Sequence, residues 1–293
     1  MLDGLRSWLI SLIEIAFMGF DSSLAESADV LRNGFDETTW NNVLTLSGYL
    51  KPFCLIIVGF CLMIELAQVA SRVDIIKWEH GLKICVKMVI AKVCIDVAPT
   101  FLRACNGQAQ EWVGLMTDGG SALGEQAQSK LIPLVEQVDG FAEILGLVLV
   151  TLIVMLAVKI CGLIITVMAY GRMFEIYVYL AVSPFPFAFL PLGGDGGASI
   201  SRITSKFIKS FIAVCLQGVM MIIVMRVFDM VMSSVIANTY AEIIAATDPA
   251  TGAVADANAA ITNLSFTMLL GSIALIMSVV KSGSWAKNVI DAM

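Results

Sequence analysis

Apolar residues in this chain gather in runs far longer than the core elements of a soluble protein require. A helix needs about 20 mostly apolar residues to cross a bilayer. Five runs approach or exceed that length, namely 49–70, 82–103, 141–170, 207–236 and 264–280. The pattern therefore predicts an all-α fold, a polytopic membrane helix bundle with about five spans.

The first twenty residues follow a different pattern, in which apolar residues such as Leu2, Leu5, Leu9 and Leu12 recur at helical spacing. This spacing predicts an amphipathic helix in the membrane interface rather than a cleavable signal peptide. We expect four segments in the chain. They are an N-terminal amphipathic helix with an acidic outer segment (1–48), a first helical hairpin (49–103), a central outward loop (104–140) and a membrane core with a proline-broken segment and a Gly-rich basic loop (141–293).

Apolar residues continue beyond 170 into a stretch that contains Pro184 and Pro186. Proline cannot donate a backbone hydrogen bond, so the helix must break there. A broken backbone at membrane depth persists only where protein or water covers its polar groups. We expect 174–192 to be a re-entrant or interface-lying element and the functional core, with Arg172 and Glu175 anchoring its entrance as an ion pair. If 174–192 instead crosses the membrane fully, the chain has six spans.

Composition supports a membrane protein, because 58% of the residues are hydrophobic and only 14% are charged, against about a quarter in soluble domains. The net charge of −6 conceals an uneven distribution of basic residues along the chain. Lysine and arginine cluster in 71–83, 202–209 and 281–287, and the segments between these clusters are basic-poor. Basic loops mark the cytoplasmic side. The five-span arrangement therefore predicts a multi-pass protein of the cell (inner, cytoplasmic) membrane, with its N-terminus outside and its C-terminus in the cytoplasm.

Several charged residues fall inside the predicted spans, where each costs about 2.5–3.5 kcal/mol unless it finds a partner or water. They are Lys87, Lys92, Asp96, Lys159, Arg226 and Asp229. Lys92 with Asp96, and Arg226 with Asp229, have the spacing of pairs on one helix face. Glu65 can pair with Lys83 or Lys87 across the hairpin, whereas Lys159 must find another helix or water. Alternatively, the lysines of the second span line a hydrated lumen or a subunit interface.

The sequence predicts no enzyme and no catalytic, cofactor or metal site. The seven cysteines lie in or beside apolar runs without CxxC spacing, as small hydrophobic residues do. No Ser/His/Asp set or HExxH motif occurs, and the glycines from Gly193 to Gly197 lack the GK[ST] ending of a phosphate-binding loop. We expect that glycine run to act as a hinge.

One motif resembles a known family. The segment 171–176 (GRMFEI) leads to 181–186 (AVSPFP) and then to a basic stretch with Arg202 and Lys206. This pattern resembles the TrbL-like polytopic inner-membrane subunit of type IV secretion and conjugative transfer systems. The resemblance implies a non-enzymatic, homo-oligomeric channel or scaffold subunit. It also implies contact with membrane lipid, with other secretion subunits including transfer ATPases, and transiently with the transferred DNA. The residues alone leave open a secondary transporter, because broken helices and buried charges also occur there, or a small pore-forming protein.

Overall fold

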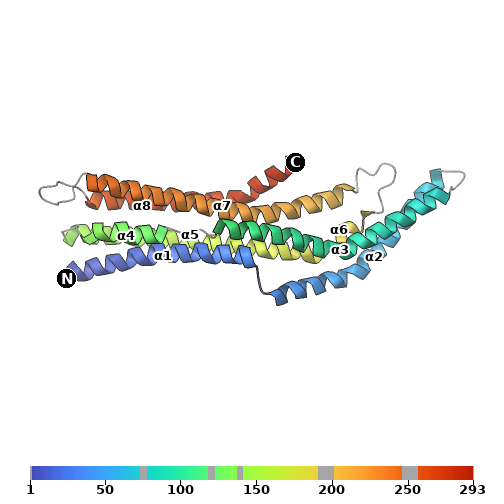
Figure 1. Ribbon diagram of the computed structural model, residues 1–293, viewed down its shortest axis with the longest axis horizontal. Helices are drawn as coiled ribbons and strands as arrows, with labels where there is room; N and C mark the ends of the chain where they lie inside the picture. Colours follow the sequence, from blue (N-terminus) through green and yellow to red (C-terminus); the bar gives the residue numbers. More distant parts are fainter. Residues whose placement is uncertain are drawn as a thin grey trace. The chain divides into compact units, whose positions relative to one another are not determined.

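The computed structural model describes residues 2–72, 78–117, 123–136, 141–190, 201–245 and 257–292 (Figure 1). The predicted Gly-rich basic loop at Gly193–Gly197 lies outside them. Every regular element of the described residues is a helix, and none of them forms a strand. The elements are α1 (Leu2–Asn33), α2 (Glu37–Arg72), α3 (Trp78–Thr117), α4 (Leu123–Glu136), α5 (Phe141–Val182), α6 (Pro184–Phe187), α7 (Ser201–Ala245) and α8 (Ala257–Asp291). The predicted all-α class is confirmed.

Five helices of the described residues are long and apolar enough to cross a membrane. They are Gly4–Asn33, Glu37–Gln68, Phe141–Phe187, Ile203–Glu242 and Ile261–Ile290. This finding confirms a polytopic membrane helix bundle, but the five differ from those predicted. The N-terminal helix joins the set because α1 is 32 residues long. The predicted span 82–103 is absent from it, and that stretch of α3 carries five charged residues.

The long helices do not end where a bilayer would require. Helix α5 is continuous over 42 residues, about 63 Å at about 1.5 Å per residue, which is twice the thickness of the hydrocarbon core. The predicted helix end near Tyr170, with a separate element from Phe174, is therefore wrong. Gly171 is the only residue between them that disfavours a helix, and one interior glycine costs only about 1 kcal/mol.

The helices form two compact units. The first comprises residues 1–32, 113–170 and 219–282, and within it α1 lies along α5 (Figure 1). Ser27 Oγ lies 3.2 Å from Thr166 Oγ1, and a Cβ added to Gly162 would lie 2.8 Å from Ser23 Oγ. Small residues let two helices approach this closely. The residue later in α1 contacts the residue later in α5, so the two helices run parallel.

Other contacts of the first unit bring α4, α7 and α8 into the same bundle. The Phe20 ring meets the Phe228 ring edge-on at 5.5 Å. Cys161 Sγ donates a hydrogen bond to the Ser272 carbonyl at 3.4 Å. The Gly124 N–H donates to Asp21 Oδ2 at 2.7 Å, which places a carboxylate at the N-terminus of α4, where the helix dipole favours it. Part of the predicted central loop is thus a helix attached to α1.

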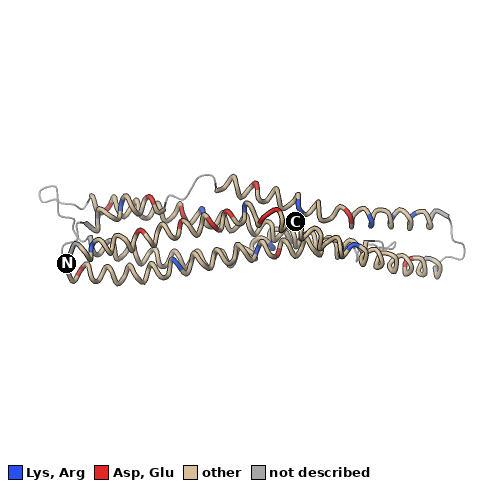
Figure 2. Tube along the Cα trace, turned by 90° about the horizontal axis from the view of Figure 1, so that it is seen from below, with Lys and Arg blue, Asp and Glu red and all other residues tan. Residues whose placement is uncertain are grey.

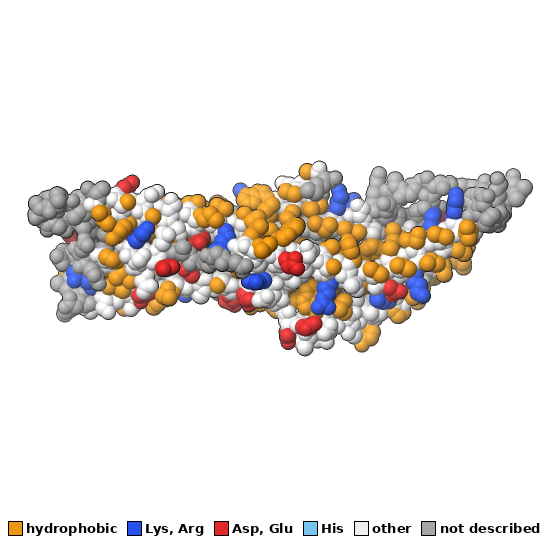
Figure 3. All heavy atoms as spheres, viewed as in Figure 1, with side chains coloured by type: hydrophobic (Ala, Val, Ile, Leu, Met, Phe, Trp, Pro, Cys, Tyr) orange, Lys and Arg blue, Asp and Glu red, His pale blue; other side chains and the backbone are white. Residues whose placement is uncertain are grey.

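The second unit comprises residues 33–112, 171–218 and 283–293, and the α2–α3 hairpin forms most of it. Gly34 leads into it with φ of 66°, a left-handed conformation suited to glycine after a helix. The Phe35 N–H donates to the Tyr177 hydroxyl at 3.0 Å, and Trp40 packs edge-on against the Tyr177 ring at 4.8 Å. Hydrophobic side chains gather over the hairpin on the face seen in Figure 3, as expected of a surface that meets lipid or another protein.

Candidate functional site: the proline break between α5 and α6

The interruption predicted at Pro184 and Pro186 is present but small, because Ser183 between the two helices keeps helical backbone angles, with φ of −50° and ψ of −35°. Helix α5 ends at Val182, and α6 is a separate helix of four residues. Pro184 has no N–H to donate to the Leu180 carbonyl one turn earlier. That carbonyl instead accepts from Ser183 Oγ at 2.8 Å and from the Ser183 N–H at 3.3 Å. Ser183 is fully buried, so the chain satisfies the carbonyl that its own proline leaves without a partner.

The second polar group of the break is covered from another helix. Thr204 of α7 donates its hydroxyl to the Pro186 carbonyl at 3.0 Å, and the bond is buried. The end of α6 closes with a hydrogen bond from the Ala188 N–H to the Phe185 carbonyl at 3.1 Å. Protein therefore covers the broken backbone, as its position in an apolar stretch requires.

The apolar side of α6 rests on the hairpin. Phe187 and Ala188 are buried in one cluster with Cys54 and Val58 of α2 and with Ala91, Ile95 and Ala98 of α3. Small residues from α3 leave room for the Phe187 ring. The proline element is thereby held between α2, α3 and α7 in the second unit.

The predicted ion pair at the entrance is also present. Arg172 Nη1 lies 2.5 Å from Glu175 Oε2, and the pair is only partly exposed. On the same stretch of α5, Phe174 and Tyr177 hold Phe35, with ring centroids 5.4 and 5.6 Å away. The last turns of α5 thus carry the ion pair and also the aromatic side chains that pack against Phe35, just before α2 begins.

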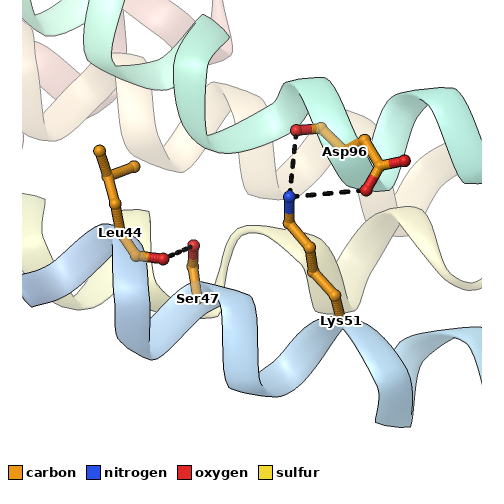
Figure 4. A network of polar contacts seen from close by, with 4 residues as sticks. All are labelled: Leu44, Ser47, Lys51 and Asp96. Carbon is orange, nitrogen blue, oxygen red and sulfur yellow. Dashed lines mark hydrogen bonds and ion pairs between the residues drawn. The ribbon is translucent and has the colours of Figure 1, made fainter. Parts of the chain in front are cut away.

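Charges in the hairpin are paired from helix to helix. Lys51 Nζ lies 3.5 Å from Asp96 Oδ1 and donates to the Asp96 carbonyl at the same distance (Figure 4). The expected Lys92–Asp96 pair is therefore wrong, because a lysine from the facing helix takes the carboxylate. Lys92 is exposed. The expected pairing of Glu65 is confirmed, with Lys87 as the partner.

A third pair, between Arg103 and Glu37 at 3.8 Å, completes the set. The three α2 members lie at equal intervals along the helix, and their signs alternate from acid to base to acid. The α3 members alternate in the opposite sense. Figure 2 shows charged residues along the lengths of the helices rather than only at their ends. The hairpin can carry them because each of these three charges on α2 meets its opposite on α3.

The remaining candidate charges lie in the first unit and are held differently. The Lys159 ammonium lies against Gly19 of α1, on a neighbouring helix as expected. Arg226 donates from Nε to the Met116 carbonyl at 2.7 Å and from Nη2 to the Thr117 carbonyl at 2.5 Å. These carbonyls end α3, so Arg226 caps that helix. Asp229 is buried and lines the same cavity as Arg226, while their mutual pairing stays a prediction.

The structure thus brings Arg172, Glu175, Pro184 and Pro186 into one unit, along with the hairpin charges, and leaves Lys159, Arg226 and Asp229 in the other. The sequence analysis missed Thr204 and Tyr177, because their partners, the Pro186 carbonyl and the Phe35 N–H, lie far from them in the sequence. Lys51 could have been considered, because the Glu65–Lys87 pair in an antiparallel hairpin sets Lys51 within two turns of Asp96. Among the described residues, no group of three or more His, Cys, Asp and Glu side chains could hold a metal ion.

Comparison with known proteins gives one match. The family model described as TrbL/VirB6 plasmid conjugal transfer like protein matches residues 23–184, more than half of the chain. The matched range includes the hairpin, α5 and Pro184. No curated protein and no solved structure matches the chain.

Proposed function

The chain belongs to the TrbL/VirB6 plasmid conjugal transfer-like family and is a multi-pass membrane subunit of a conjugal transfer or type IV secretion machine; from this premise we propose that it is a channel or scaffold subunit. The observation that carries this proposal is the covered break between α5 and α6. A break at membrane depth persists only where protein or water covers its polar groups, so it suits a helix packed within an assembly rather than one that only spans lipid. Its location between α2, α3 and α7 suits an element that links the membrane helices to partners.

The proposal includes assembly and orientation. Several copies form a homo-oligomer in the cell (inner) membrane, in contact with lipid. The N-terminus lies outside and the C-terminus in the cytoplasm, where the basic segments contact other secretion subunits, including transfer ATPases. The transferred DNA contacts the subunit transiently. The lysines and arginines of 202–209 and 281–287 support this orientation with the five apolar helices as the spans, whereas the basic cluster at 71–83 would then lie outside. Single cysteines at Asp118 and Gly194, both outside the described residues, test it. An impermeant thiol reagent applied to intact cells should label only the first.

The proline break provides the functional test. Replacing Pro184 and Pro186 by alanine restores two backbone donors and removes about 3 kcal/mol of helix penalty for each proline, so α5 should extend through the break. We expect the double variant to insert at normal abundance and to lose conjugative transfer. Transfer frequency between donor and recipient cells, with membrane abundance measured in parallel, is the assay.

One matched control and one further test variant are available in the same chain. Pro52 and Pro99 lie inside α2 and α3, which continue through them, so Pro52→Ala/Pro99→Ala should leave transfer intact. Thr204→Val removes the hydroxyl that covers the Pro186 carbonyl while keeping the side-chain shape, and should reduce transfer in part. Full transfer by an abundant Pro184→Ala/Pro186→Ala protein would show that the break has no role.

A further inference from the structure

The first unit contains a cavity of about 240 Å³ between α1, α7 and the end of α3. Charged side chains of both signs line it, namely Asp21, Asp29, Arg32, Arg226 and Asp229. The rest of the lining includes the small residues Ala25 and Ala28 and the apolar residues Leu24, Ile222 and Met225. This volume holds several water molecules.

The depth of the cavity follows from the packing of α1 on α5. Ser23 faces Gly162 and Ser27 faces Thr166, so each residue of α1 lies level with the α5 residue 139 positions later. Asp21 is thus level with Ile160, and Arg32 with Gly171. The cavity extends along α1 between these two levels.

The opposite side of the unit is apolar at the same levels. Helix α5 exposes large apolar side chains along its whole length, including Leu163 at 65% and Val167 at 61% exposure. The exposed Lys159, whose ammonium lies against Gly19 of α1, interrupts this apolar stripe, and the stripe continues past Gly171 to Val182. The cavity therefore lies at levels where α5 exposes mainly apolar side chains.

Helix α1 changes character over the same stretch. Its exposed positions before Asp21 are Gly4, Ser7, Trp8, Ser11, Ile15 and Met18, of which three are large and apolar and none is charged. From Ser22 onwards the exposed positions are Ser22, Ala25, Glu26, Asp29, Arg32 and Asn33. Charged side chains facing hydrocarbon each cost about 2.5–3.5 kcal/mol, so this side of α1 does not face lipid.

We propose that this cavity is an aqueous vestibule, in which α1 and α7 face water at levels where α5 faces lipid. The five charged side chains already have hydrogen-bonding or electrostatic partners in the protein. The vestibule therefore takes water and small hydrophilic solutes rather than one tightly bound ion. The inference deepens the proposed function, on which it rests, by naming the wall of the subunit that faces the hydrated passage.

Thiol accessibility tests the vestibule in the full chain in its native membrane. Ala25→Cys and Ala28→Cys place a thiol in the cavity, and Leu163→Cys and Val167→Cys place one on the opposite side at matched levels. Each is made in a variant without the seven native cysteines. The probe is a membrane-impermeant quaternary-ammonium methanethiosulfonate, applied to membranes accessible from both sides.

We expect the two cavity cysteines to react at least ~10-fold faster than the two controls, because a thiolate forms readily only in contact with water. Equal rates at all four positions, or faster reaction of the controls, would overturn the inference. Protein abundance identifies a variant that fails to fold, and Leu24→Cys, also in the lining, then replaces it.

The outcome is separable from that of the proposed function. Fast labelling of the cavity in a protein that transfer does not require would leave the vestibule standing and remove the proposed role. Slow labelling in a protein that transfer does require would overturn the vestibule and leave the proposed role standing.

Discussion

The α2–α3 hairpin and the bundle built on α1, α5 and α7 carry charged residues within apolar helices in two different ways. In the hairpin, Glu37, Lys51 and Glu65 each meet an opposite charge on α3. In the bundle, Asp21 holds the first turn of α4 and Arg226 holds the last carbonyls of α3. Acid–base pairs can be replaced by apolar pairs, whereas groups that hold backbone beside a cavity cannot. The two regions should therefore respond differently to the same kinds of substitution.

The largest loss of stability should follow from removing the ion-pair partner of Glu65, whose side chain is 7% exposed. Lys87→Met leaves that carboxylate buried without its partner, and breaking a buried pair in this way costs about 3–5 kcal/mol. Replacing both members, as Glu65→Gln/Lys87→Met, should restore most of the loss. Unfolding in mixed micelles of mild detergent and dodecyl sulfate, followed by circular dichroism, measures the difference. Equal losses in the single and double variants would mean that the pair does not act as a unit.

A smaller loss is expected in the bundle from Arg226→Gln, about 2 kcal/mol, because the glutamine amide can keep one of the two hydrogen bonds and each hydrogen bond from a charged donor contributes about 1.5–3 kcal/mol. Arg226→Lys is the matched control and should recover less than half, because an ammonium lacks the fork that reaches two acceptors. The same unfolding assay applies. Full recovery by lysine would show that charge alone matters here.

The Lys51–Asp96 pair should couple by only about 0.5 kcal/mol, as partly exposed pairs do. A double-mutant cycle with Lys51→Met and Asp96→Asn measures this coupling free energy. The parallel cycle with Lys92→Met and Asp96→Asn should give no coupling, because Asp96 is paired with the other helix. The reverse result would restore the pairing expected from sequence spacing.

The smallest effect should come from Glu37→Gln, within about 0.5 kcal/mol, as for other surface substitutions. Glu37 is 78% exposed and 3.8 Å from its partner. Arg103→Ala should cost more than Glu37→Gln, since the guanidinium also lies 5.6 Å from the centre of the Trp40 ring and such contacts contribute about 0.5–1 kcal/mol. Thermal unfolding of the two variants side by side ranks them. A larger loss for Glu37→Gln would assign the contact to charge rather than to the ring.

Local chemistry made some features predictable. The two prolines at 184 and 186 predict an interruption, although Pro52 and Pro99 lie inside α2 and α3 without ending them. Arg172 and Glu175 meet because three residues separate them on one helix. The partner of Asp96 was not predictable in the same way. Lys92 satisfies the spacing rule, but the register of two helices decides in favour of Lys51. The length of α5 was missed because hydropathy reports where a bilayer can lie and not where a helix stops.

The residue that covers the break was also unpredictable from the sequence. The backbone chemistry requires a donor for the Pro186 carbonyl, but only the packing of α7 shows that Thr204, among the hydroxyl residues of that helix, provides it. The cavity was also invisible in the sequence. Asp21, Asp29 and Arg32 read there as part of an acidic outer segment, and only the contacts with α5 and α7 place them at the levels of an apolar stripe.

The pairing of α1 with α5 has a consequence for how the protein is made. Ser27 meets a partner 139 residues later in the chain, and ribosomes add about 5–20 residues per second, so α1 waits roughly 7–28 s for the helix that covers it. The hairpin pair of Glu65 and Lys87 is complete after 22 residues. During biosynthesis the hairpin can form in the membrane almost at once, whereas α1 spends that interval as an amphipathic segment with seven charged residues and no α5 beside it. The early ribosome-bound chain is therefore the stage at which an insertase or chaperone has most to protect.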